Sequence, residues 1–453
     1  MVNKNKTSSN LSNWISREKW IERVLTFDPS WYMVCMGTGI LVQLLASNFP
    51  YPAHWLRTVG YIFWILDICL FVLFSALSLA RAFMFPKVAM GVLSDFQQTS
   101  YLGAIPIAWE TIGTGLVIFY SNHESASYVA QVFFWIAVFF TLLVTCGGVY
   151  AMYRKQGQHS MNEVTGAWLL IFIPMIVGAA YGSNLANAIS LKNGVAVLMV
   201  SYLMLSLGIG LSSLILGIYL WRLMSCQLPP REAIVSTFVP VGPPSMAAFT
   251  FLNLAVALSR NVTHGNFDFR ETWEPTITPA TRAAVAEMIM WIGVLLCLFF
   301  LGIATFFLIE AVASVTTRVP KTFNIGLWGF VFPFGVYANA FCRLSTVLRN
   351  DGMKGWATAC VLCTVLLWLM CAFLTTYKAV WQGKLFFAPG LQGWVEQKQL
   401  DEISQKTGAS KDQVLDNAWS SSRSEDGTLT RRQPNNDGTY EPAITRSKTS
   451  QSV

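Results

Sequence analysis

The 453-residue chain has few charged side chains and no extended polar domain. Asp, Glu, Lys and Arg make up 12% of it, about half the share found in soluble proteins, while 54% is hydrophobic and 14% aromatic. No phosphate-binding loop is present, which argues against a nucleotide-driven pump. A receptor or scaffold would need an outer ligand domain or a long structured part, and neither is visible. The composition indicates a polytopic membrane protein.

Histidine is rare, and cysteine is confined mostly to apolar stretches. The four histidines fall in predicted loops: His54, His123, His159 and His264. An electron carrier with haem would need axial ligands at mid-membrane, and a zinc or redox site needs accessible thiolates, which Cys360-x-x-Cys363 within an apolar span does not offer. We therefore expect no metal, no cofactor and no enzymatic chemistry. The net charge of +7 has no basic, aromatic-rich face behind it, so no nucleic-acid partner is expected.

Ten windows are apolar enough to cross a bilayer, which takes about 20 helical residues. They are 29–48, 58–85, 101–120, 127–153, 165–190, 194–224, 232–258, 283–316, 323–345 and 355–380. The chain is therefore predicted to be an all-α integral membrane protein with one ten-helix transmembrane domain, 26–385. A cytosolic N-terminal segment, 1–25, precedes this domain. The polar tail that follows, 386–453, has too few apolar residues to bury a core and is predicted to be largely disordered.

Interrupted and continuous windows alternate along the chain. The odd-numbered windows contain a proline or a glycine pair at these positions: Gly37-Thr38-Gly39 after Pro29, Pro106, Pro174, 240–244 and Pro333-Phe334-Gly335. Lipid cannot satisfy freed backbone groups, so interrupted helices persist only where protein covers them or a water-filled cavity passes them. The alternation predicts five helical hairpins around a central pore, with the Pro/Gly-kinked helices inside. Close helix packing through small residues is the alternative at any single position.

The residues at these interruptions are the candidate lining of the path. They are Gly37, Thr38, Gly39, Pro106, Glu110, Pro174, Gly242, Pro243, Ser245 and Pro333. Half-helix N-termini at membrane depth carry a partial positive charge that suits anions. No Lys or Arg lies near the middle of an interrupted window, so an anion would be held weakly, which favours throughput. The pattern predicts a channel or transporter for small anions.

Four acidic residues lie within the windows: Asp67, Glu110, Glu287 and Glu310. Acids at membrane depth are candidates for function because their burial is costly. Glu110 is the strongest of them, since it follows Pro106 by four residues on an interrupted helix. In its protonated form it could couple proton and anion movement. It could equally be a hydrogen-bonded residue that braces a neighbouring helix, and both interpretations stay open.

The loops predict the orientation in the membrane. An even number of spans puts both termini on one side, and the loops on that side carry more Lys and Arg, which assigns them to the cytosol. Asn261-Val262-Thr263 is a glycosylation sequon in the longest loop of the opposite side. Both termini are therefore expected in the cytosol, with Asn261 as the candidate glycosylation site.

Two regions resemble a known family. Phe27-Asp28-Pro29, followed by 36–40 (MGTGI) and 49–57 (FPYPAHWLR), resembles the opening of fungal sulfite efflux pumps. The segment 324–330 (NIGLWGF) resembles the ninth helix of the tellurite-resistance/dicarboxylate transporter family, which includes plant slow anion channels and yeast malic acid transporters. The resemblance covers roughly 25–385. It implies ten helices as five hairpins around a pore, a homotrimer whose protomers each conduct, and small anions as substrates.

The resemblance also implies a pore gate, which maps to Phe332, directly before Pro333. Two departures from the sulfite pumps concern the substrate: 241–245 (VGPPS) is more similar to the malic acid transporters, and Glu110 stands where the sulfite pumps have smaller, uncharged residues. The expected function is sulfite or bisulfite efflux across the plasma membrane. Proton-linked transport of malate or a related dicarboxylate is the alternative. It would need a wider site and a cationic anchor, and no anchor is evident mid-pore.

Overall fold

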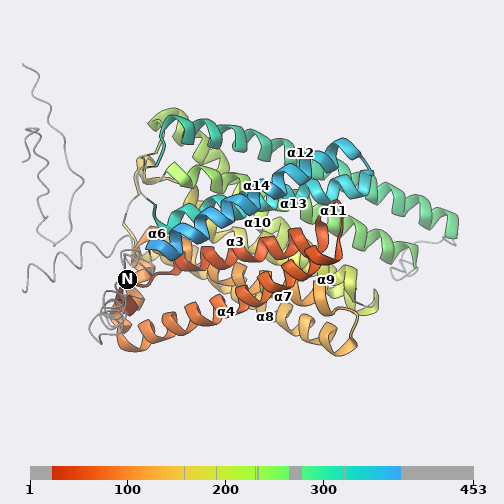
Figure 1. The fold of residues 1–453 in the computed structure, drawn as a ribbon, viewed down its shortest axis with the longest axis horizontal. Coiled ribbons are helices and arrows are strands. Elements are labelled where there is room, and N and C mark those ends of the chain that lie inside the picture. Colours follow the sequence, from red (N-terminus) through yellow and green to blue (C-terminus); the bar gives the residue numbers. More distant parts are fainter. Residues whose placement is uncertain are drawn as a thin grey trace, which may run out of the picture. The chain divides into compact units, whose positions relative to one another are not determined.

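The computed structural model describes residues 23–157, 159–189, 191–229, 231, 234–264, 278–320 and 323–378, and their regular structure is entirely helical (Figure 1). The elements are η1 Pro29–Trp31, α3 Tyr32–Gln43, η2 Leu44–Asn48, α4 His54–Met84, α5 Pro86–Gly91, η3 Val92–Ser94, α6 Phe96–Tyr101, α7 Ala104–Tyr120, α8 Glu124–Lys155, η4 Met161–Glu163, η5 Gly166–Ile171, α9 Ile173–Ala188, α10 Leu191–Cys226, η6 Ile234–Val241, α11 Gly242–Thr263, α12 Pro279–Thr317, η7 Ile325–Phe330, α13 Val331–Leu348 and α14 Asp351–Thr376. The predictions for 1–25 and 386–453 fall almost wholly outside these ranges.

Nine helical stretches among the described residues are long and apolar enough to cross a membrane. They correspond to nine of the ten predicted windows. The remaining window, 165–190, is also helical, but it is divided into η5 and α9, and α9 has only 16 residues. The all-helical membrane class predicted from the sequence is confirmed.

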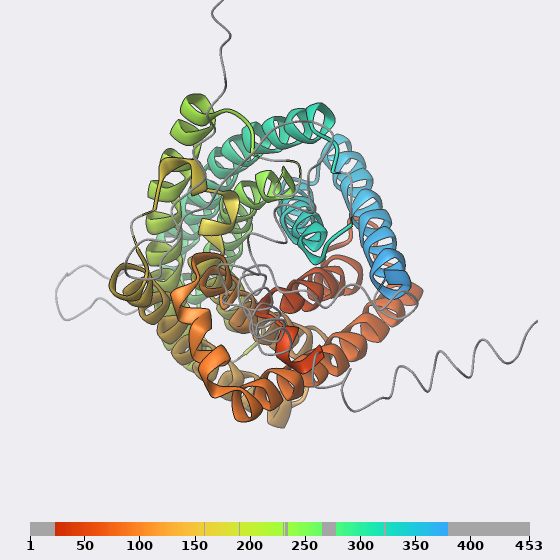
Figure 2. The ribbon, with the colours of Figure 1, turned by 90° about the vertical axis from the view of Figure 1, so that its left-hand side faces the viewer.

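The spans form two layers. In the spans that contain α3, α7, α11 and α13, between 67% and 83% of the most apolar window is buried, and α9 is buried along most of its length. In those of α4, α8, α10, α12 and α14 the share is between 17% and 39%. Figure 2 shows these five long helices surrounding the first group. We call the five surrounding helices the outer helices and the five helices that they surround the inner helices.

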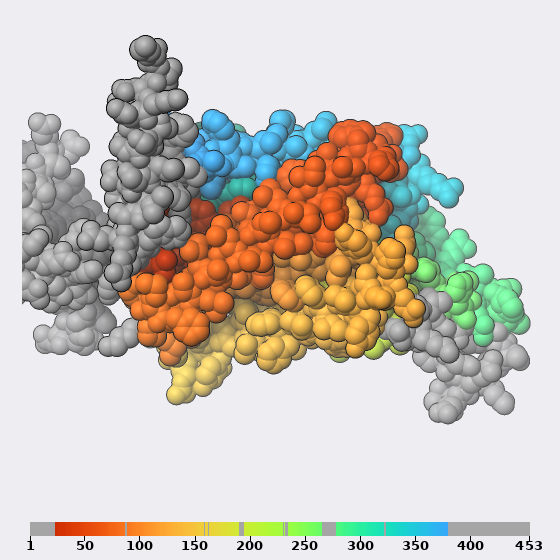
Figure 3. Space-filling model, turned by 60° about the horizontal axis from the view of Figure 1, so that its bottom comes forward, coloured from red at the N-terminus to blue at the C-terminus, as the bar shows by residue number. Residues whose placement is uncertain are grey.

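The outer surface is apolar, as a lipid-facing surface must be. Large side chains exposed on it include Leu73, Phe139, Leu211 and Phe299. Figure 3 shows one flank of the molecule, formed by α4 and α8. Because large apolar side chains are exposed along the outer helices, we infer that lipid and not water surrounds this surface.

The inner helices α3 and α13 run in the same direction. A Cβ on Gly37 would lie 3.2 Å from Val331, and one on Gly335 would lie 2.8 Å from Ile40, so α3 and α13 advance together. The inner helix α3 runs antiparallel to the outer helix α4 that follows it: Tyr32 at the start of α3 contacts Ser78 near the end of α4 at 3.2 Å, and a Cβ on Gly60 near the start of α4 would lie 2.7 Å from Ala46 of η2. The inner helices α3 and α13 therefore begin at one end of the bundle and finish at the other.

The helix type changes near several of the predicted interruptions, whereas α3 runs unbroken through Gly37, Thr38 and Gly39, and kinks in the inner helices stay a prediction. Four inner helices follow directly on a 3₁₀ segment: η1 precedes α3, η5 precedes α9, η6 precedes α11 and η7 precedes α13. Proline lacks an amide hydrogen and suits the first turn of an α-helix. Pro174 and Pro243 occupy such first-turn positions in α9 and α11. The backbone groups that this change frees lie in buried segments, where protein rather than lipid surrounds them.

Two glycines allow backbones to touch where these segments meet. A Cβ on Gly166 would lie 1.9 Å from the carbonyl oxygen of Ser236, and one on Gly103 would lie 2.0 Å from that of Leu170. No other residue fits there without moving the backbone. The inner segments η5 and η6 thus depend on Gly166 for their contact.

Gly166→Ala should lower the stability of the protein by about 1–3 kcal/mol, the usual cost of overpacking a well-packed site. Gly210→Ala is the matched control, because a Cβ at Gly210 on α10 meets nothing within 4 Å. It should leave stability unchanged or raise it by up to about 1 kcal/mol through helix propensity. Thermal unfolding of the purified protein in detergent measures both, and equal melting temperatures for the two variants would contradict the close contact.

Candidate functional site

One face of α13 contacts the outer helices, and the opposite face is therefore the inward one. Tyr337 shares a hydrogen bond of 3.0 Å with Thr305 of α12, and Phe341 packs on Trp356 of α14 with ring centroids 6.4 Å apart. Phe334 stacks on Tyr337 along the same side. At 3.6 residues per turn, the opposite face carries Phe332, Val336, Asn339 and Arg343. This face is turned toward the other inner helices.

Phe332 lies in the first turn of α13, directly after the 3₁₀ segment η7, and is 2% exposed. The next residue, Pro333, approaches α11, where a Cβ on Gly242 would lie 3.8 Å from it. Phe238 and Phe330, from the 3₁₀ segments η6 and η7, pack edge to face with centroids 4.6 Å apart. The start of α13 therefore lies in an aromatic and apolar region between neighbouring inner helices.

A first group of amides lies further along the inward face of α13. The Asn339 Nδ2 donates to Gln43 Oε1 on α3 at 3.1 Å, and the Asn48 Nδ2 donates to Asn339 Oδ1 at 2.7 Å. Asn339 itself is fully buried. Buried amides are stable only when they are hydrogen-bonded, so these contacts hold α3, η2 and α13 together about two turns beyond Phe332.

A second group of amides joins α9 and α11. The Asn253 Nδ2 donates to Ser183 Oγ at 3.0 Å and to Asn184 Oδ1 at 2.7 Å, while the Asn187 Nδ2 donates to the Asn253 carbonyl at 3.0 Å. The Asn184 Nδ2 and the Asn187 Oδ1 are buried and have no partner among the described residues. These two free polar atoms can bind water or a small ion. Asn339 and Asn253 lie near the middle of α13 and α11, whereas Gln43, Asn184 and Asn187 lie toward the ends of α3 and α9.

The other predicted path residues occupy varied surroundings. Gly37 lies against Trp328, and Gly39 against Thr111 of α7 and Asp67 of α4. The Thr38 hydroxyl donates to Val34 O at 2.8 Å and accepts from Trp368 of α14 at 3.1 Å, so Thr38 contacts an outer helix. These contacts fit the packing alternative at 37–39. Pro106, Pro174, Pro243, Ser245 and Pro333 are all buried, and Ser245 Oγ has no hydrogen-bond partner among the described residues.

Two buried acids accept hydrogen bonds from threonines of adjacent helices. Glu110 Oε1 accepts from Thr141 of α8 at 2.7 Å, and Asp67 Oδ2 accepts from Thr111 of α7 at 3.1 Å. Both carboxyl groups are fully buried, and neither belongs to an ion pair within the described ranges. Glu110 is thus attached to an outer helix, as the bracing interpretation expects. Its role in proton movement stays a prediction.

Asn261 is fully buried near the end of α11, where its Nδ2 donates to Ala257 O at 2.8 Å. Glycosylation at Asn261 stays a prediction, and it requires this end of α11 to open. In the part of the chain that the structure describes, no three His, Cys, Asp or Glu side chains come together as metal ligands.

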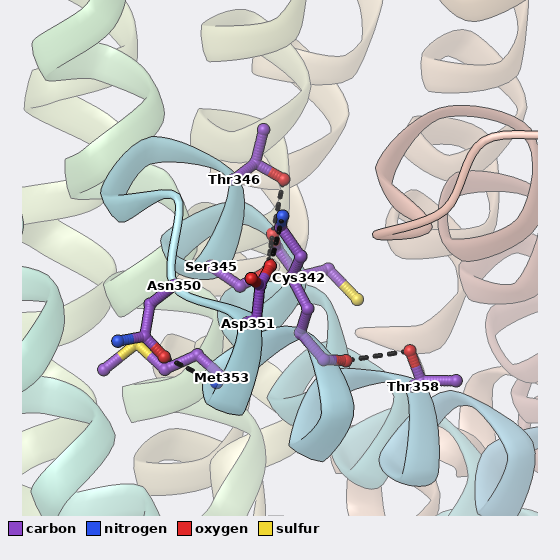
Figure 4. Close-up of polar contacts among 8 residues, drawn as sticks. Cys342, Ser345, Thr346, Asn350, Asp351, Met353 and Thr358 are labelled. Atoms are coloured by element: carbon purple, nitrogen blue, oxygen red, sulfur yellow. Dashed lines mark hydrogen bonds and ion pairs between the residues drawn. The ribbon is translucent and has the colours of Figure 1, made fainter.

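The turn between α13 and α14 is well defined by polar contacts (Figure 4). Arg349 ends α13 in the left-handed conformation, with φ 51°, and Asn350 caps α14 by accepting from Met353 N at 2.9 Å. Asp351 pairs with Lys354 at 2.8 Å. This turn fixes the direction of the last residues of α13 relative to α14.

The sequence predictions missed Arg343 on the inward face of α13, although its spacing from Phe332 is visible in the sequence.

A titratable residue lies at the opposite end, just before η1. Asp28 is 2% exposed, and its Oδ1 accepts from Ser30 N at 3.0 Å and from the Ser30 hydroxyl. Burial raises the pKa of Asp28 to about 6, against the opposing effects of Ser30 and of the Arg81 charge. Burial also raises the pKa of Asp95, whose Oδ1 caps α6 by accepting from Gln98 N at 2.8 Å.

Comparison with known proteins identifies relatives of the whole bundle. A profile of the voltage-dependent anion channel family, SLAC1, matches residues 26–376. The chain is 31% identical to the sulfite efflux pump SSU1 of Arthroderma benhamiae over 368 residues, which cover 80% of this chain and 93% of that protein. The pump of the same name from Trichophyton rubrum matches to the same extent. A malic acid transport protein of Schizosaccharomyces pombe is 23% identical, with 78% of each chain covered.

The buried carboxyl of Asp28 should make stability depend on pH. The pKa of Asp28 is about 6 in the folded protein against 3.8 for an exposed aspartate. Between pH 3.8 and about pH 6, therefore, Asp28 is protonated in the folded protein and ionised in the unfolded chain. Stability should therefore fall as pH rises through this window, by up to about 3 kcal/mol. Asp28→Asn should flatten this part of the profile.

Thermal unfolding in detergent at a series of pH values measures this effect. Asp351→Asn is the matched control, because Asp351 is 87% exposed and lies in a surface ion pair, which contributes little. If the Asp28→Asn profile kept the slope of the unsubstituted protein, the assignment of the titration to Asp28 would be wrong.

Proposed function

Because the chain belongs to the voltage-dependent anion channel family, we propose that it exports sulfite or bisulfite through a path between its inner helices. The similarity to the sulfite efflux pump of Arthroderma benhamiae carries this proposal, since its identity of 31% over 93% of that protein exceeds the 23% over 78% found for the malic acid transport protein. The family and these relatives are channels or transporters.

The architecture that we propose has ten spans arranged as five hairpins around a central pore, in a transport domain over 26–385. It is supported by the difference in burial between inner and outer helices and by the parallel course of α3 and α13. The inner helices carry the amide groups, whereas the outer helices expose large apolar side chains. A homotrimer in the plasma membrane, with both termini in the cytosol, completes the proposal.

Within this architecture Phe332 is the gate. Three features support this role: its burial, its position where η7 passes into α13, and its place on the same face as Asn339. A buried aromatic ring excludes water from a narrow passage, and hydrophobic constrictions of this kind close channels by dewetting. Beyond it, the Asn184 Nδ2, which has no partner among the described residues, can replace part of the hydration shell of an anion without holding it by a fixed charge.

Phe332→Ala should raise the rate of sulfite flux at least several-fold in proteoliposomes, because the ring that fills the passage is removed. Phe334→Ala is the matched control: Phe334 is two residues away on the face that stacks on Tyr337, and its removal should not open the path. Flux is measured with sulfite, malate, chloride and nitrate in turn. A sulfite rate that does not rise in Phe332→Ala would refute the gate, and a wild-type protein that carries malate but not sulfite would refute the substrate.

Proton-linked malate transport is the second candidate, supported by the malic acid relative and by the buried carboxyl of Glu110. Glu110→Gln tests it, since the amide oxygen of glutamine can still accept from Thr141. We expect the ratio of Glu110→Gln flux to wild-type flux to stay constant with pH, as a bracing role requires. A ratio that changes with pH would favour proton coupling. Thr141→Val removes the hydrogen bond to Glu110 but keeps the titratable carboxyl group. Comparing it with Glu110→Gln separates the effect of losing the hydrogen bond from the effect of losing the titratable proton.

A further inference from the structure

Arg343 is a cation on the inward face of α13. It follows Phe332 by eleven residues and Asn339 by four, so the three side chains leave the helix in nearly the same direction over about three turns. The contacts of Tyr337 and Phe341 with the outer helices occupy the other side. Arg343 is only partly exposed, and its Nε is buried.

Other arginines toward this end of the inner helices are engaged with the protein. The Arg57 Nη2 donates to Ile118 O at 3.1 Å, near the end of α7, and the Arg260 Nη1 donates to Asn187 O, near the end of α9. Carbonyl groups at helix C-termini lack intrahelical donors, so an arginine satisfies them both as a donor and as a charge. Arg57 and Arg260 therefore have structural roles that use their guanidinium groups.

Arg343 has no such role. Among the described residues no carbonyl or carboxylate accepts a hydrogen bond from it, and its buried Nε is without a partner. The nearest acid in the sequence, Asp351, is 2.8 Å from Lys354. A partly buried cation without a counter-ion is unfavourable for a folded protein. An anion from solution would remove this cost.

We propose that Arg343 binds the transported oxyanion at the end of the path where the inner helices finish. The guanidinium group presents paired N–H donors that match two oxygens of a sulfite or carboxylate group. The negative ends of the inner helices lie at the same end and disfavour anions, so a cation is needed there to offset them. This inference rests on the proposed function, and it assigns to the path a cationic site that the sequence prediction did not contain.

The position of Arg343 also explains how a fixed charge can serve a conducting path. The charge lies about three turns from Phe332, so a bound anion is concentrated at one end and does not occupy the narrow region near the gate. One guanidinium group offers one site for one anionic group. The second carboxylate of malate would need a second cation, and α13 carries no charged residue besides Arg343 between Val331 and Leu348, which favours the smaller anion.

Sulfite flux into proteoliposomes at a series of concentrations tests the proposal. Arg343→Gln should raise the KM for sulfite about tenfold, the effect of losing one charge-assisted contact of roughly 1.4 kcal/mol, with the maximal rate little changed. Arg343→Lys keeps the positive charge but loses the paired N–H donors of the guanidinium group. Its KM for sulfite should therefore lie between that of the wild-type protein and that of Arg343→Gln. Melting temperatures in detergent report whether each variant is folded.

Arg349→Asn is the matched control, because Arg349 carries the same charge at the end of the same helix and asparagine tolerates its left-handed backbone. An unchanged KM in a folded Arg343→Gln protein would overturn the proposal. So would an equal rise in Arg349→Asn, which would show a general field effect and no site.

A failure of the proposed function gives a different result. If the wild-type protein carries malate, chloride or nitrate but no sulfite, the substrate proposal fails, and the KM comparison is repeated with the anion that is carried. If it carries none of them, stabilisation of the purified protein by sulfite and by malate is measured as a shift in melting temperature. A shift that Arg343→Gln abolishes supports the anion site, and no shift in the wild-type protein overturns it.

Discussion

The structure depends on one constraint: backbone groups freed inside a membrane must be covered by protein. Four inner helices begin with a 3₁₀ segment, and prolines remove further amides near these points. In contact with lipid such groups would cost several kcal/mol each. The long outer helices prevent this contact. The outer helices satisfy their backbone groups within uninterrupted α-helix, and the inner helices depend on them to keep freed backbone groups away from lipid.

This arrangement brings polar side chains together inside an apolar shell. The amides of Gln43, Asn48 and Asn339 form one group, and those of Asn184, Asn187 and Asn253 form another. Both groups lie at contacts between inner helices, the first between α3 and α13 and the second between α9 and α11. An amide can hydrate an ion and release it, since it carries no net charge. The chemistry of the inner helices is thus suited to passage, with Arg343 as the one inward-facing charge that α13 contributes.

Several properties of the site could be predicted from sequence and others could not. The alternation of interrupted and continuous windows predicted which spans are buried, because proline and glycine act on the backbone wherever they stand. It could not predict that Gly37 and Gly39 face Trp328 and Thr111, since the neighbour of a glycine depends on how the helices are assembled. For the same reason the sequence could not predict the neighbours of Glu110: its Oε1 accepts from Thr141 of the outer helix α8, and a Cβ on Gly178 of the inner helix α9 would lie 2.8 Å from the same oxygen.

The sequence by itself determined the helical class, the approximate bounds of the spans and which of them are buried, because these follow from hydropathy and from the chemistry of proline. Only the tertiary structure decided the direction in which each side chain points. Arg343 shows the difference: its spacing from Phe332 can be read in the sequence, but that its Nε has no partner among the described residues depends on everything that packs around α13. Backbone preferences are local, whereas the partners of a side chain are supplied by residues far away in the sequence.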